Sequence, residues 1–429
     1  MSLEPIGRAS REELDAGSTI VVVGASLAGL RAAEALRERG FGGRLVVVGA
    51  ESEAPYDRPP LSKEYLAGAW GSERISLLEP ERIETLGLDL RLGVGAGALD
   101  LGGGRVVLED GDALGFDGLV VATGAAPRSW PHPVPAGVVT LRTLGDADAL
   151  RRLLEDRGRR LVVVGGGFLG LEVAATARRL GAEVTIVEPL SSLLGRVLPP
   201  IVGAAVRDLH EQHGVEVLSG VSVTGFDGGR RLRGVAVEGG RKLSTDVALV
   251  AIGVRPSTGW LEGSGLRLDD GVVCDSTLQA APGVVVAGDV ARFPHPLAPG
   301  PVRLEHWTNA AEQGRHAAAT LLGGTTTRAR AAARVGPGGS SELQAFTTVP
   351  YFWSDQFDLK IQAIGLPQPD DEVVVVDGSV ASGRFVACCG RDGALAGVVG
   401  FGRPRQLMAF HPLLRRRTSL SEARSLLDG

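Results

Sequence analysis

Three glycines, Gly165, Gly167 and Gly170, follow a run of apolar residues with the G-x-G-x-x-G spacing of a loop that binds a dinucleotide pyrophosphate. The pattern predicts a strand over Leu161–Val164 and helical periodicity over Leu171–Leu180. In such a loop the first glycine permits a tight turn, the second lets the phosphate approach the backbone, and the third lets helix and strand pack closely. The unpaired N–H groups at the start of the helix then attract the phosphate.

A carboxylate stands where this chemistry needs one. The next predicted strand, Glu183–Val187, ends at Glu188, which can accept a hydrogen bond from a ribose 2′-hydroxyl and repels a 2′-phosphate. The sequence therefore favours NADH over NADPH at this loop.

A second fingerprint lies near the start of the chain. It runs G-A-S-L-A-G from Gly24 to Gly29, after a predicted strand over Thr19–Val23 and before a helix that continues to Arg39. Ser26 takes the place of the middle glycine, and its side chain narrows the approach of a phosphate.

The acid for this first fingerprint is less well placed. The following strand is predicted over Leu45–Val48, and the first acid after it is Glu51. Either Glu51 binds the ribose, or this unit has no ribose-binding acid and Glu51 is a solvated loop residue. Two such units in one chain indicate either an internal duplication or two different dinucleotides.

A rigid, proline-rich loop over residues 55–63, P-Y-D-R-P-P-L-S-K, carries Arg58 and Lys63. Two cations held rigidly suit a pyrophosphate and an electron-rich ring. The alternative is a pair of solvated loop cations. This loop favours two different dinucleotides over a simple duplication.

Three short apolar runs each end in a glycine turn, which is typical of buried strands that lead to a ligand-binding edge. They cover residues 118–124, 248–253 and 284–289. In the last of them Asp289, after Gly288, is placed to accept a sugar hydroxyl.

Composition limits the class of protein. The 429 residues are enough for two to four domains, and no apolar run reaches the roughly 20 residues needed to span a membrane. The polar segment Met1–Gly17 resembles no signal peptide and is expected to be a frayed tail. A net charge of −5 argues against nucleic-acid binding.

Cysteine usage argues against disulfide and metal chemistry. Cys274, Cys388 and Cys389 form an odd set without C-x-x-C or C-x-x-x-x-C spacing, so we expect no disulfide framework and no metal site. This usage is typical of a cytoplasmic protein.

With these motifs in order, the chain resembles the FAD-dependent NADH:ferredoxin reductases of bacterial oxygenase systems, such as putidaredoxin and rhodocoxin reductase. They lie within the two-dinucleotide-domain flavoprotein superfamily of glutathione reductase. The resemblance spans about residues 19–365. Besides the two fingerprints it rests on residues 56–63, 122–124 (A-T-G), 253–256 (G-V-R-P), 287–289 (A-G-D), 305–310 (E-H-W-T-N-A) and 350–356 (P-Y-F-W-S-D-Q).

The resemblance implies an α/β fold with two interleaved Rossmann-like domains and a C-terminal α+β domain. The FAD-binding domain would be discontinuous, over residues 18–129 and 257–330, with an NAD-binding domain over 130–256 between its parts. Residues 331–429 would form the C-terminal domain, and the Gly- and Thr-rich stretch Gly323–Ser341 would be the linker into it.

The resemblance also implies site residues. Lys63, Glu172 and Trp307 would position the flavin and the nicotinamide without acid–base chemistry, although Glu172 alone reads as a surface residue of its helix. The residues expected at FAD are Gly24, Ser26, Gly29, Glu51, Arg58, Lys63, Ala122, Thr123, Gly124, Gly288, Asp289, Trp307 and Phe352. Those expected at NADH are Gly165, Gly167, Phe168, Leu169, Gly170, Glu172, Glu188 and Gly253. Trp353 would line the flavin or be a core aromatic, and His306 is expected only to form hydrogen bonds.

Several other activities remain open to such a chain. A disulfide reductase, or an oxidase of the cysteine-dependent type, needs redox cysteines near the FAD motifs, where this chain has none. A soluble NADH oxidase or a quinone reductase remains an alternative, and a membrane-bound form would need an amphipathic anchor such as Leu413–Leu427, which otherwise reads as a solvated helix. An apoptosis-inducing-factor-like flavoprotein is disfavoured by the acidic balance.

The resemblance implies a separate partner as well. No cysteine set for an iron–sulfur cluster is present, so the electron acceptor would be an acidic [2Fe-2S] ferredoxin that serves an oxygenase. Candidate docking cations are Arg315, Arg403, Arg405 and Arg415–Arg417. We expect a monomer or a weak dimer that contacts neither nucleic acid nor membrane.

Overall fold

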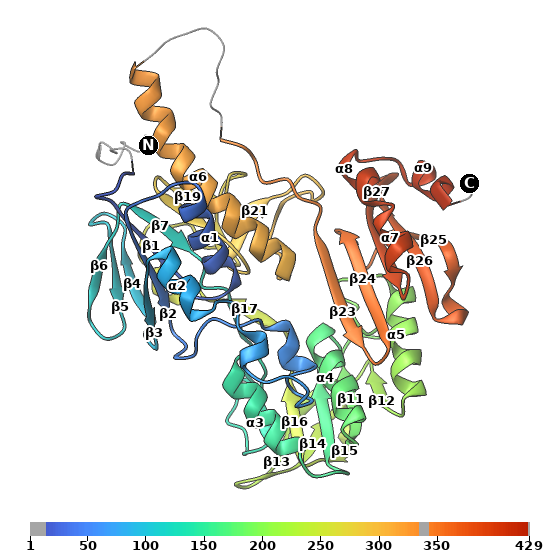
Figure 1. Ribbon diagram of the computed structural model, residues 1–429. Coiled ribbons are helices and arrows are strands. Elements are labelled where there is room, and N and C mark those ends of the chain that lie inside the picture. The colour runs from blue at the N-terminus through green and yellow to red at the C-terminus, as the bar shows by residue number, and fades with distance from the viewer. Residues whose placement is uncertain (1–13, 334–342, 428–429) are drawn as a thin grey trace, which may run out of the picture. The chain divides into compact units, whose positions relative to one another are not determined.

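The computed structural model describes residues 14–333 and 343–427 (Figure 1). Most of the expected N-terminal tail therefore lies outside the described residues. The chain forms two compact units, one from the described parts of residues 1–55, 77–124 and 256–347, the other from 56–76, 125–255 and the described part of 348–429. The division into three domains that the resemblance implies remains a prediction, since the described residues group into two compact units.

The first unit is built on a six-stranded sheet in the order β19-β20-β7-β1-β2-β3. Every neighbouring pair in it is parallel except β19 with β20. Its strands are β1 (Thr19–Val23), β2 (Arg44–Gly49), β3 (Leu88–Leu92), β7 (Gly118–Val121), β19 (Gln279–Ala281) and β20 (Val284–Val286). The inner residues of β1, β2, β7 and β20 are Val-, Ile- and Leu-rich and buried, as in parallel strands covered on both faces, whereas those of β3 and β19 at the two edges are only partly buried.

Smaller elements complete this unit. A three-stranded meander joins β4 (Ala96–Asp100), β5 (Arg105–Leu108) and β6 (Ala113–Gly115), and a second small sheet joins β18 (Val272–Val273), β21 (Ala291–Pro294) and β22 (Pro301–Val302). The helices are α1 (Leu27–Glu38), α2 (Pro80–Leu86) and α6 (Trp307–Ala333).

Helices α1 and α6 pack side by side, as Figure 1 shows. Gly314 of α6 makes this close approach possible, because a Cβ there would lie 2.3 Å from the carbonyl oxygen of Ala28. Helix α6 continues to Ala333, so the expectation that the linker begins at Gly323 is wrong, since helical hydrogen bonding extends through this Gly- and Thr-rich stretch. The rest of that predicted linker, from residue 334, lies outside the described residues.

The second unit contains a five-stranded parallel sheet in the order β12-β11-β10-β16-β9. Its strands are β9 (Val138–Val139), β10 (Arg160–Val164), β11 (Glu183–Glu188), β12 (Glu216–Ser219) and β16 (Val247–Val250). The helices are α3 (Leu144–Leu154), α4 (Phe168–Arg179) and α5 (Pro200–Gln212). The remaining strands of this region are β8 (Ala125–Pro127), β13 (Val223–Gly228), β14 (Leu232–Val237), β15 (Lys242–Ser244) and β17 (Val254–Pro256).

The same unit contains an antiparallel sheet from the C-terminal part of the chain, in the order β23-β24-β27-β26-β25. Its strands are β23 (Tyr351–Gln356), β24 (Leu359–Gly365), β25 (Glu372–Ser379), β26 (Arg384–Arg391) and β27 (Ala394–Phe401). Three short helices follow: α7 (Pro404–Met408), α8 (His411–Arg415) and α9 (Leu420–Arg424).

Most of the leucines in these last helices are core residues. Leu413, Leu414 and Leu420 are buried in one cluster with Ile364 and Val398 of the sheet. The apolar side chains over residues 413–423 are thus not free to form an amphipathic anchor, because they pack against the sheet, whereas Leu426 near the end of the segment is exposed. No helix in the described part of the chain is long and apolar enough to cross a membrane.

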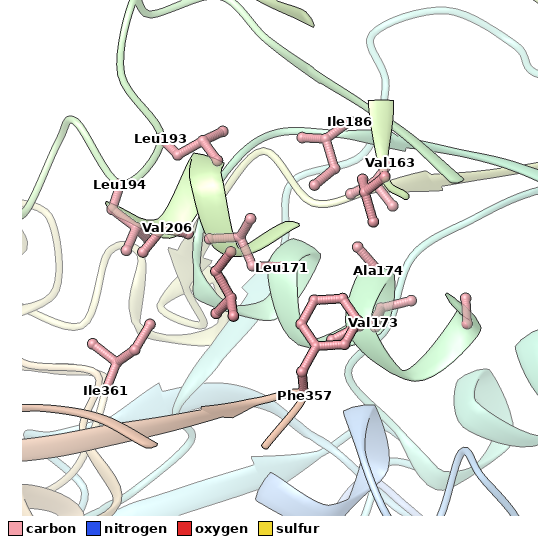
Figure 2. Packing of buried hydrophobic residues seen from close by; sticks show 14 of the residues in the cluster. Val163, Leu171, Val173, Ala174, Ile186, Leu193, Leu194, Val206, Phe357 and Ile361 are labelled. Carbon is pink, nitrogen blue, oxygen red and sulfur yellow. The ribbon is translucent and has the colours of Figure 1, made fainter. Parts of the chain in front are cut away.

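The two sheets of the second unit share one hydrophobic core. Figure 2 shows Leu171 and Val173 of α4 near Phe357 and Ile361, which come from the β23–β24 hairpin. Burial of these side chains holds the C-terminal sheet against the dinucleotide fold, since apolar burial contributes about 25 cal/mol per Å².

Candidate functional site

In the first unit the A-T-G stretch lies beside the first glycine fingerprint. Strand β7 pairs with β1, and Gly24 has φ +122°, so that a Cβ there would lie 2.1 Å from the carbonyl oxygen of Ala122. Thr123 donates its hydroxyl to the Ser257 carbonyl at 2.8 Å, and Gly124 has φ +66°. The structure thus brings together two motifs that lie a long way apart in the sequence.

Ser26 is the N-cap of α1 and forms no capping hydrogen bond through its side chain. Gly29 lies in the first turn of that helix, where a Cβ would lie 1.9 Å from the carbonyl oxygen of Gly24. The loop therefore has the tight turn that a pyrophosphate requires, and the Ser26 side chain does not cap the N–H groups at the start of α1.

The A-G-D turn is held by a residue that sequence reasoning missed. Gly288 donates its N–H to Oε1 of Gln313 at 2.8 Å, and Gln313 is fully buried in α6. Gln313 Nε2 and Asn309 Oδ1 are buried without a hydrogen-bond partner among the described residues. The unsatisfied Nε2 of Gln313, whose oxygen holds this turn, fits a bound polar group such as the sugar and phosphates of FAD. In the sequence, Asn309 and Gln313 stand four residues apart in the helix that follows the A-G-D motif, a spacing that places both amides on one side of the helix.

His306 precedes α6, and Trp307 begins it. Burial lowers the pKa of His306 to about 4, although the negative charge of Asp289 opposes this shift. His306 is therefore neutral at physiological pH. Its role as a hydrogen-bonding residue remains a prediction. Trp307 at the flavin, like Glu51 and Asp289 at a sugar hydroxyl, remains a prediction.

In the second unit the glycine fingerprint has the predicted local shape. Gly165 has φ +111°, and a Cβ there would lie 2.4 Å from the carbonyl oxygen of Ala251. At Gly170 a Cβ would lie 2.5 Å from the Gly165 carbonyl oxygen, whereas none of the described atoms lies within 4 Å of a Cβ placed on Gly167. Gly167 is the N-cap of α4, so there is room for a phosphate at the start of this helix. Leu169, in its first turn, is 37% exposed.

The Glu188 carboxylate ends β11 and binds the glycine loop. Its Oε2 accepts the N–H of Gly166 at 2.6 Å, and its Oε1 accepts the N–H of Leu190 at 2.9 Å. A carboxylate has further acceptor sites on both oxygens, so a ribose hydroxyl can still bind there.

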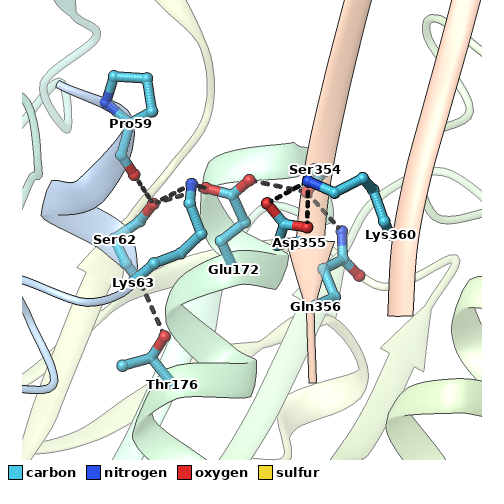
Figure 3. A network of polar contacts seen from close by, with 9 residues as sticks. All are labelled: Pro59, Ser62, Lys63, Glu172, Thr176, Ser354, Asp355, Gln356 and Lys360. Carbon is cyan, nitrogen blue, oxygen red and sulfur yellow. Dashed lines mark hydrogen bonds and ion pairs between the residues drawn. The ribbon is translucent and has the colours of Figure 1, made fainter. Parts of the chain in front are cut away.

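A buried ion pair joins the proline-rich loop to α4, as Figure 3 shows. Lys63 Nζ lies 2.8 Å from Glu172 Oε2, which also accepts the Ser62 hydroxyl at 2.5 Å. Ser354 of β23 donates its hydroxyl to Glu172 Oε1 at 2.8 Å. Two of the three predicted positioning residues, Lys63 and Glu172, thus belong to one network, and Glu172 is buried rather than on the helix surface. Its partners Ser62 and Ser354 were missed, because only packing brings these serines to the carboxylate.

Arg58 has a structural role that the sequence did not predict. Its guanidinium donates to the Arg142 carbonyl at 2.7 Å and lies 5.3 Å from the centre of the Tyr56 ring. Arg58 at a pyrophosphate remains a prediction.

Two predicted aromatic residues lie on opposite sides of β23, because neighbouring side chains of a strand point to opposite faces. Phe352 packs edge-on against Phe168 at the start of α4, with ring centres 4.9 Å apart. Trp353, on the other face, stacks with Tyr351 at 5.8 Å. Gly253 has φ +95° in the turn between β16 and β17.

The cysteines are buried and poorly reactive. Burial raises the pKa of the Cys274 and Cys388 thiols to about 12, and raises that of Cys389 as well. A thiol that stays protonated is a poor nucleophile, so none of the three is suited to thiol chemistry.

The candidate docking arginines differ in their surroundings. Arg315, Arg405 and Arg415–Arg417 are exposed. Arg403 is only partly exposed, and its Nε lies 3.2 Å from Oδ2 of Asp377. Arg403 is therefore committed to an ion pair within the C-terminal sheet region and is a weaker docking candidate.

Comparison with known families agrees with this arrangement. Residues 18–314 match the family model described as pyridine nucleotide-disulphide oxidoreductase, and residues 351–428 match the model described as reductase C-terminal. Together they account for both dinucleotide fingerprints and for the C-terminal sheet with its helices. The first of these families binds FAD and NAD(P).

Individual relatives narrow the family. The chain is 39% identical over 393 residues to the ferredoxin–NAD(+) reductase component of the anthranilate 1,2-dioxygenase system of Burkholderia cepacia, which covers 89% of this chain and 91% of that protein. It is 36% identical over 410 residues to rhodocoxin reductase of Rhodococcus erythropolis, with 94% and 91% covered.

A solved structure is similar over almost the whole chain. It is the covalent putidaredoxin reductase–putidaredoxin complex, with a TM-score of 0.85, 33% sequence identity and 94% of each chain covered. This chain therefore belongs to the pyridine nucleotide-disulphide oxidoreductases and, among them, to the family of flavin-dependent ferredoxin reductases that serve oxygenase systems.

Proposed function

We propose that this protein accepts a hydride from NADH and delivers electrons one at a time to a separate, acidic [2Fe-2S] ferredoxin that feeds an oxygenase. FAD, when bound, supplies the conversion between the two-electron donor and the one-electron acceptor. The residues of the chain bind and orient the reactants, and no side chain forms a covalent intermediate.

The observation that carries this proposal is the state of the cysteines. All three are buried, and Cys388 and Cys389 lie in β26, away from every dinucleotide motif in the sequence. Disulfide-reducing members of the superfamily need a redox-active thiol pair, and this chain offers none with the necessary spacing. Direct electron transfer to a protein partner requires no thiol.

We assign residues of the chain to both dinucleotides. The turn at Gly24, the A-T-G and A-G-D stretches and the unsatisfied amides of Asn309 and Gln313 would hold FAD. The open start of α4 at Gly167 would hold the pyrophosphate of NADH, and Glu188 would accept its 2′-hydroxyl. Glu172 would orient the nicotinamide amide, with Lys63 as its counter-charge.

The proposed partner follows from charge and from the relatives. Similar proteins are named as ferredoxin reductase components of dioxygenase systems, and one, putidaredoxin reductase, is solved in a covalent complex with putidaredoxin. The exposed Arg405 and Arg415–Arg417 offer positive charge to an acidic surface, which increases the rate of association at low salt.

The test combines reduction by NADH with reduction of a partner. The purified protein, incubated with FAD, is expected to bind one FAD per chain non-covalently and to lose its yellow absorbance on mixing with NADH in a stopped-flow instrument. Small [2Fe-2S] proteins encoded near the gene are then screened, and one of them is expected to accelerate NADH oxidation.

Two results would overturn the proposal. A colourless protein that does not take up FAD would remove its basis. Rapid reduction of oxygen or a quinone, with no acceleration by any iron–sulfur protein, would instead indicate an NADH oxidase or a quinone reductase.

A further inference from the structure

One face of β23 contacts the dinucleotide fold at three successive positions. Because strand side chains alternate, Phe352, Ser354 and Gln356 share this face. Phe352 packs on Phe168, Ser354 donates to Glu172, and Gln356 contacts His210 of α5. Phe168 and Glu172 are four residues apart on α4, so they lie on the same side of that helix.

The polar members of this face form a buried chain that ends on a carboxylate. Ser354 Oγ donates to Glu172 Oε1 at 2.8 Å, and Gln356 Nε2 donates to Ser354 Oγ at 3.1 Å. Gln356 Oε1 lies 3.0 Å from His210 Nε2. His210, Ser354 and Gln356 are each 0% exposed. Figure 3 shows Ser354 and Gln356 beside the ion pair of Lys63 and Glu172.

The carboxylate determines the direction of every bond in this chain. A carboxylate paired with a lysine can only accept, so Ser354 must donate its single hydroxyl proton to it. Ser354 can then only accept from Gln356, which turns the Gln356 amide oxygen toward His210. His210 must donate to this oxygen and therefore carries its proton on Nε2. Hydrogen bonds that all point the same way strengthen one another in a buried site.

We propose that Ser354, Gln356 and His210 form a positioning chain that holds the Glu172 carboxylate in a single orientation. The inference rests on the proposed function, in which Glu172 orients the nicotinamide amide. The C-terminal sheet would in this way contribute to the hydride-transfer site through the orientation of a residue on α4. His210 and Gln356 are positioning residues, because they act through Ser354 on Glu172.

The anchors of β23 are suited to this role. Phe352 packs against Phe168 at one end of the strand, and Phe357 stacks on His213 at the other, with ring centres 3.8 Å apart. These contacts hold the strand on α4 and α5, so that its serine and glutamine have little freedom to move away from their partners. The opposite face carries a more exposed ion pair, in which Asp355 lies 2.6 Å from Lys360.

The decisive variant is Glu172→Gln, because it reverses the chain. The oxygen of the new amide would face the donors Lys63 and Ser62, so its nitrogen would donate to Ser354. Ser354 would then donate to the Gln356 oxygen after the Gln356 amide turns over, and Gln356 would donate to His210 Nε2. The His210 proton would therefore move from Nε2 to Nδ1.

This reversal can be measured without any turnover. The ¹⁵N chemical shifts of the His210 ring, assigned with His210→Gln, report its tautomer in the full-length, FAD-loaded protein. We expect the Nε2–H form in the wild type, the Nδ1–H form in Glu172→Gln, and no effect of Glu172→Gln when Ser354→Ala is also present. An Nδ1–H form in the wild type, or the same His210 tautomer in the wild type and in Glu172→Gln, would overturn the proposed chain.

Flavin reduction by NADH tests the functional consequence. Ser354→Ala is expected to lower the limiting rate of reduction about tenfold while the Kd of NADH changes less than twofold, since misplaced reactants lose rate rather than affinity. Ser354→Thr keeps the hydroxyl and should retain most of the rate. Asp355→Asn, on the other face of the same strand, is the matched control and should behave as the wild type.

The tautomer measurement and the rate measurement distinguish a failure of the positioning role from a failure of the proposed function. An unchanged rate in a folded, FAD-loaded Ser354→Ala protein would overturn the positioning role. Absence of any reduction by NADH in the wild type would overturn the proposed function, and the tautomer measurement would still decide whether the chain exists.

Discussion

The Oε2 atom of Glu188 lies 2.6 Å from the backbone nitrogen of Gly166, within the glycine loop of the second unit. With Leu190 on its other oxygen, Glu188 ties the end of β11 to the start of α4. One carboxylate therefore holds the loop in shape and presents negative charge where the ribose of a dinucleotide is expected.

Substitution at Glu188 should separate these two roles. The wild type is expected to prefer NADH over NADPH by about ten- to a hundredfold in kcat/KM, equivalent to about 1.4–2.8 kcal/mol. Glu188→Gln keeps one of the two loop contacts and removes the charge, so it should narrow the coenzyme preference by lowering the repulsion of the 2′-phosphate of NADPH. Glu188→Ala loses both loop contacts and should weaken the use of both coenzymes. Equal use of both by the wild type would show that Glu188 does not face the ribose.

Substitutions at two fingerprint glycines should have different effects, one on NADH binding and the other on the stability of the fold. Gly167→Ala has space around the new methyl group and an ordinary backbone, with φ −82°, so stability should be unchanged while the KM for NADH rises several-fold. Gly170→Ala would force a Cβ to 2.5 Å from the Gly165 carbonyl oxygen and should destabilise the fold by about 1–3 kcal/mol. Urea midpoints and NADH titrations check both effects. A large loss of stability in Gly167→Ala would contradict this assignment.

Two histidines with lowered pKa, one buried and one partly buried, should make the fold sensitive to acid. Burial lowers the pKa of His210 and of His306 to about 4, whereas both titrate near 6.5 in the unfolded chain. The unfolded state therefore binds more protons between these values. The stabilisation is fully present above about pH 6.5 and is lost as the pH falls toward 4, up to about 3 kcal/mol for each group.

Urea unfolding at several pH values tests this expectation. His210→Gln removes one titrating group and can still donate to Gln356, so its stability should fall less steeply between pH 6.5 and 4. His132→Gln is the control, because His132 is exposed and its removal should leave the slope unchanged. Parallel slopes for the wild type and His210→Gln would exclude a neutral buried His210.

Docking of a ferredoxin should depend on Arg405 more than on Arg403. Arg405→Glu reverses an exposed charge and should slow reduction of the cognate iron–sulfur protein, while the NADH-to-flavin step stays intact. Arg403→Glu would set a second negative charge beside Asp377 and should mainly lower stability.

Salt provides the accompanying measurement for the docking prediction. Charges separated by more than about 8 Å are largely screened at 0.15 M ionic strength, so added NaCl should slow reduction of the ferredoxin steeply. Reduction of a small dye should change much less, since it requires no protein docking. A ferredoxin rate that is independent of salt would exclude electrostatic docking.

The dinucleotide fold was predictable from the sequence because its signals are local. Strands β1 and β11 occur where alternating or continuous apolar runs placed them, and Gly24, Gly165 and Gly170 occupy turns or close contacts that only glycine tolerates. The resemblance was equally local, since each of its motifs is a short run of neighbouring residues. Helix continuation past Gly323 was not predictable, because glycine and threonine only lower helix propensity and do not forbid a helix.

The partners of the key side chains were decided by tertiary structure. The proline-rich loop marked Lys63 and the family resemblance marked Glu172 as separate candidates. Folding joins them in one ion pair, with Ser62 beside Lys63 and Ser354 from the C-terminal sheet on the same carboxylate. The sequence likewise marked Arg403 as a docking charge, whereas packing of the C-terminal sheet pairs it with Asp377. The physical reason is common to these cases: spacing along the chain determines local backbone shape, but a buried charge or hydroxyl finds its partner only when distant elements pack together and exclude water.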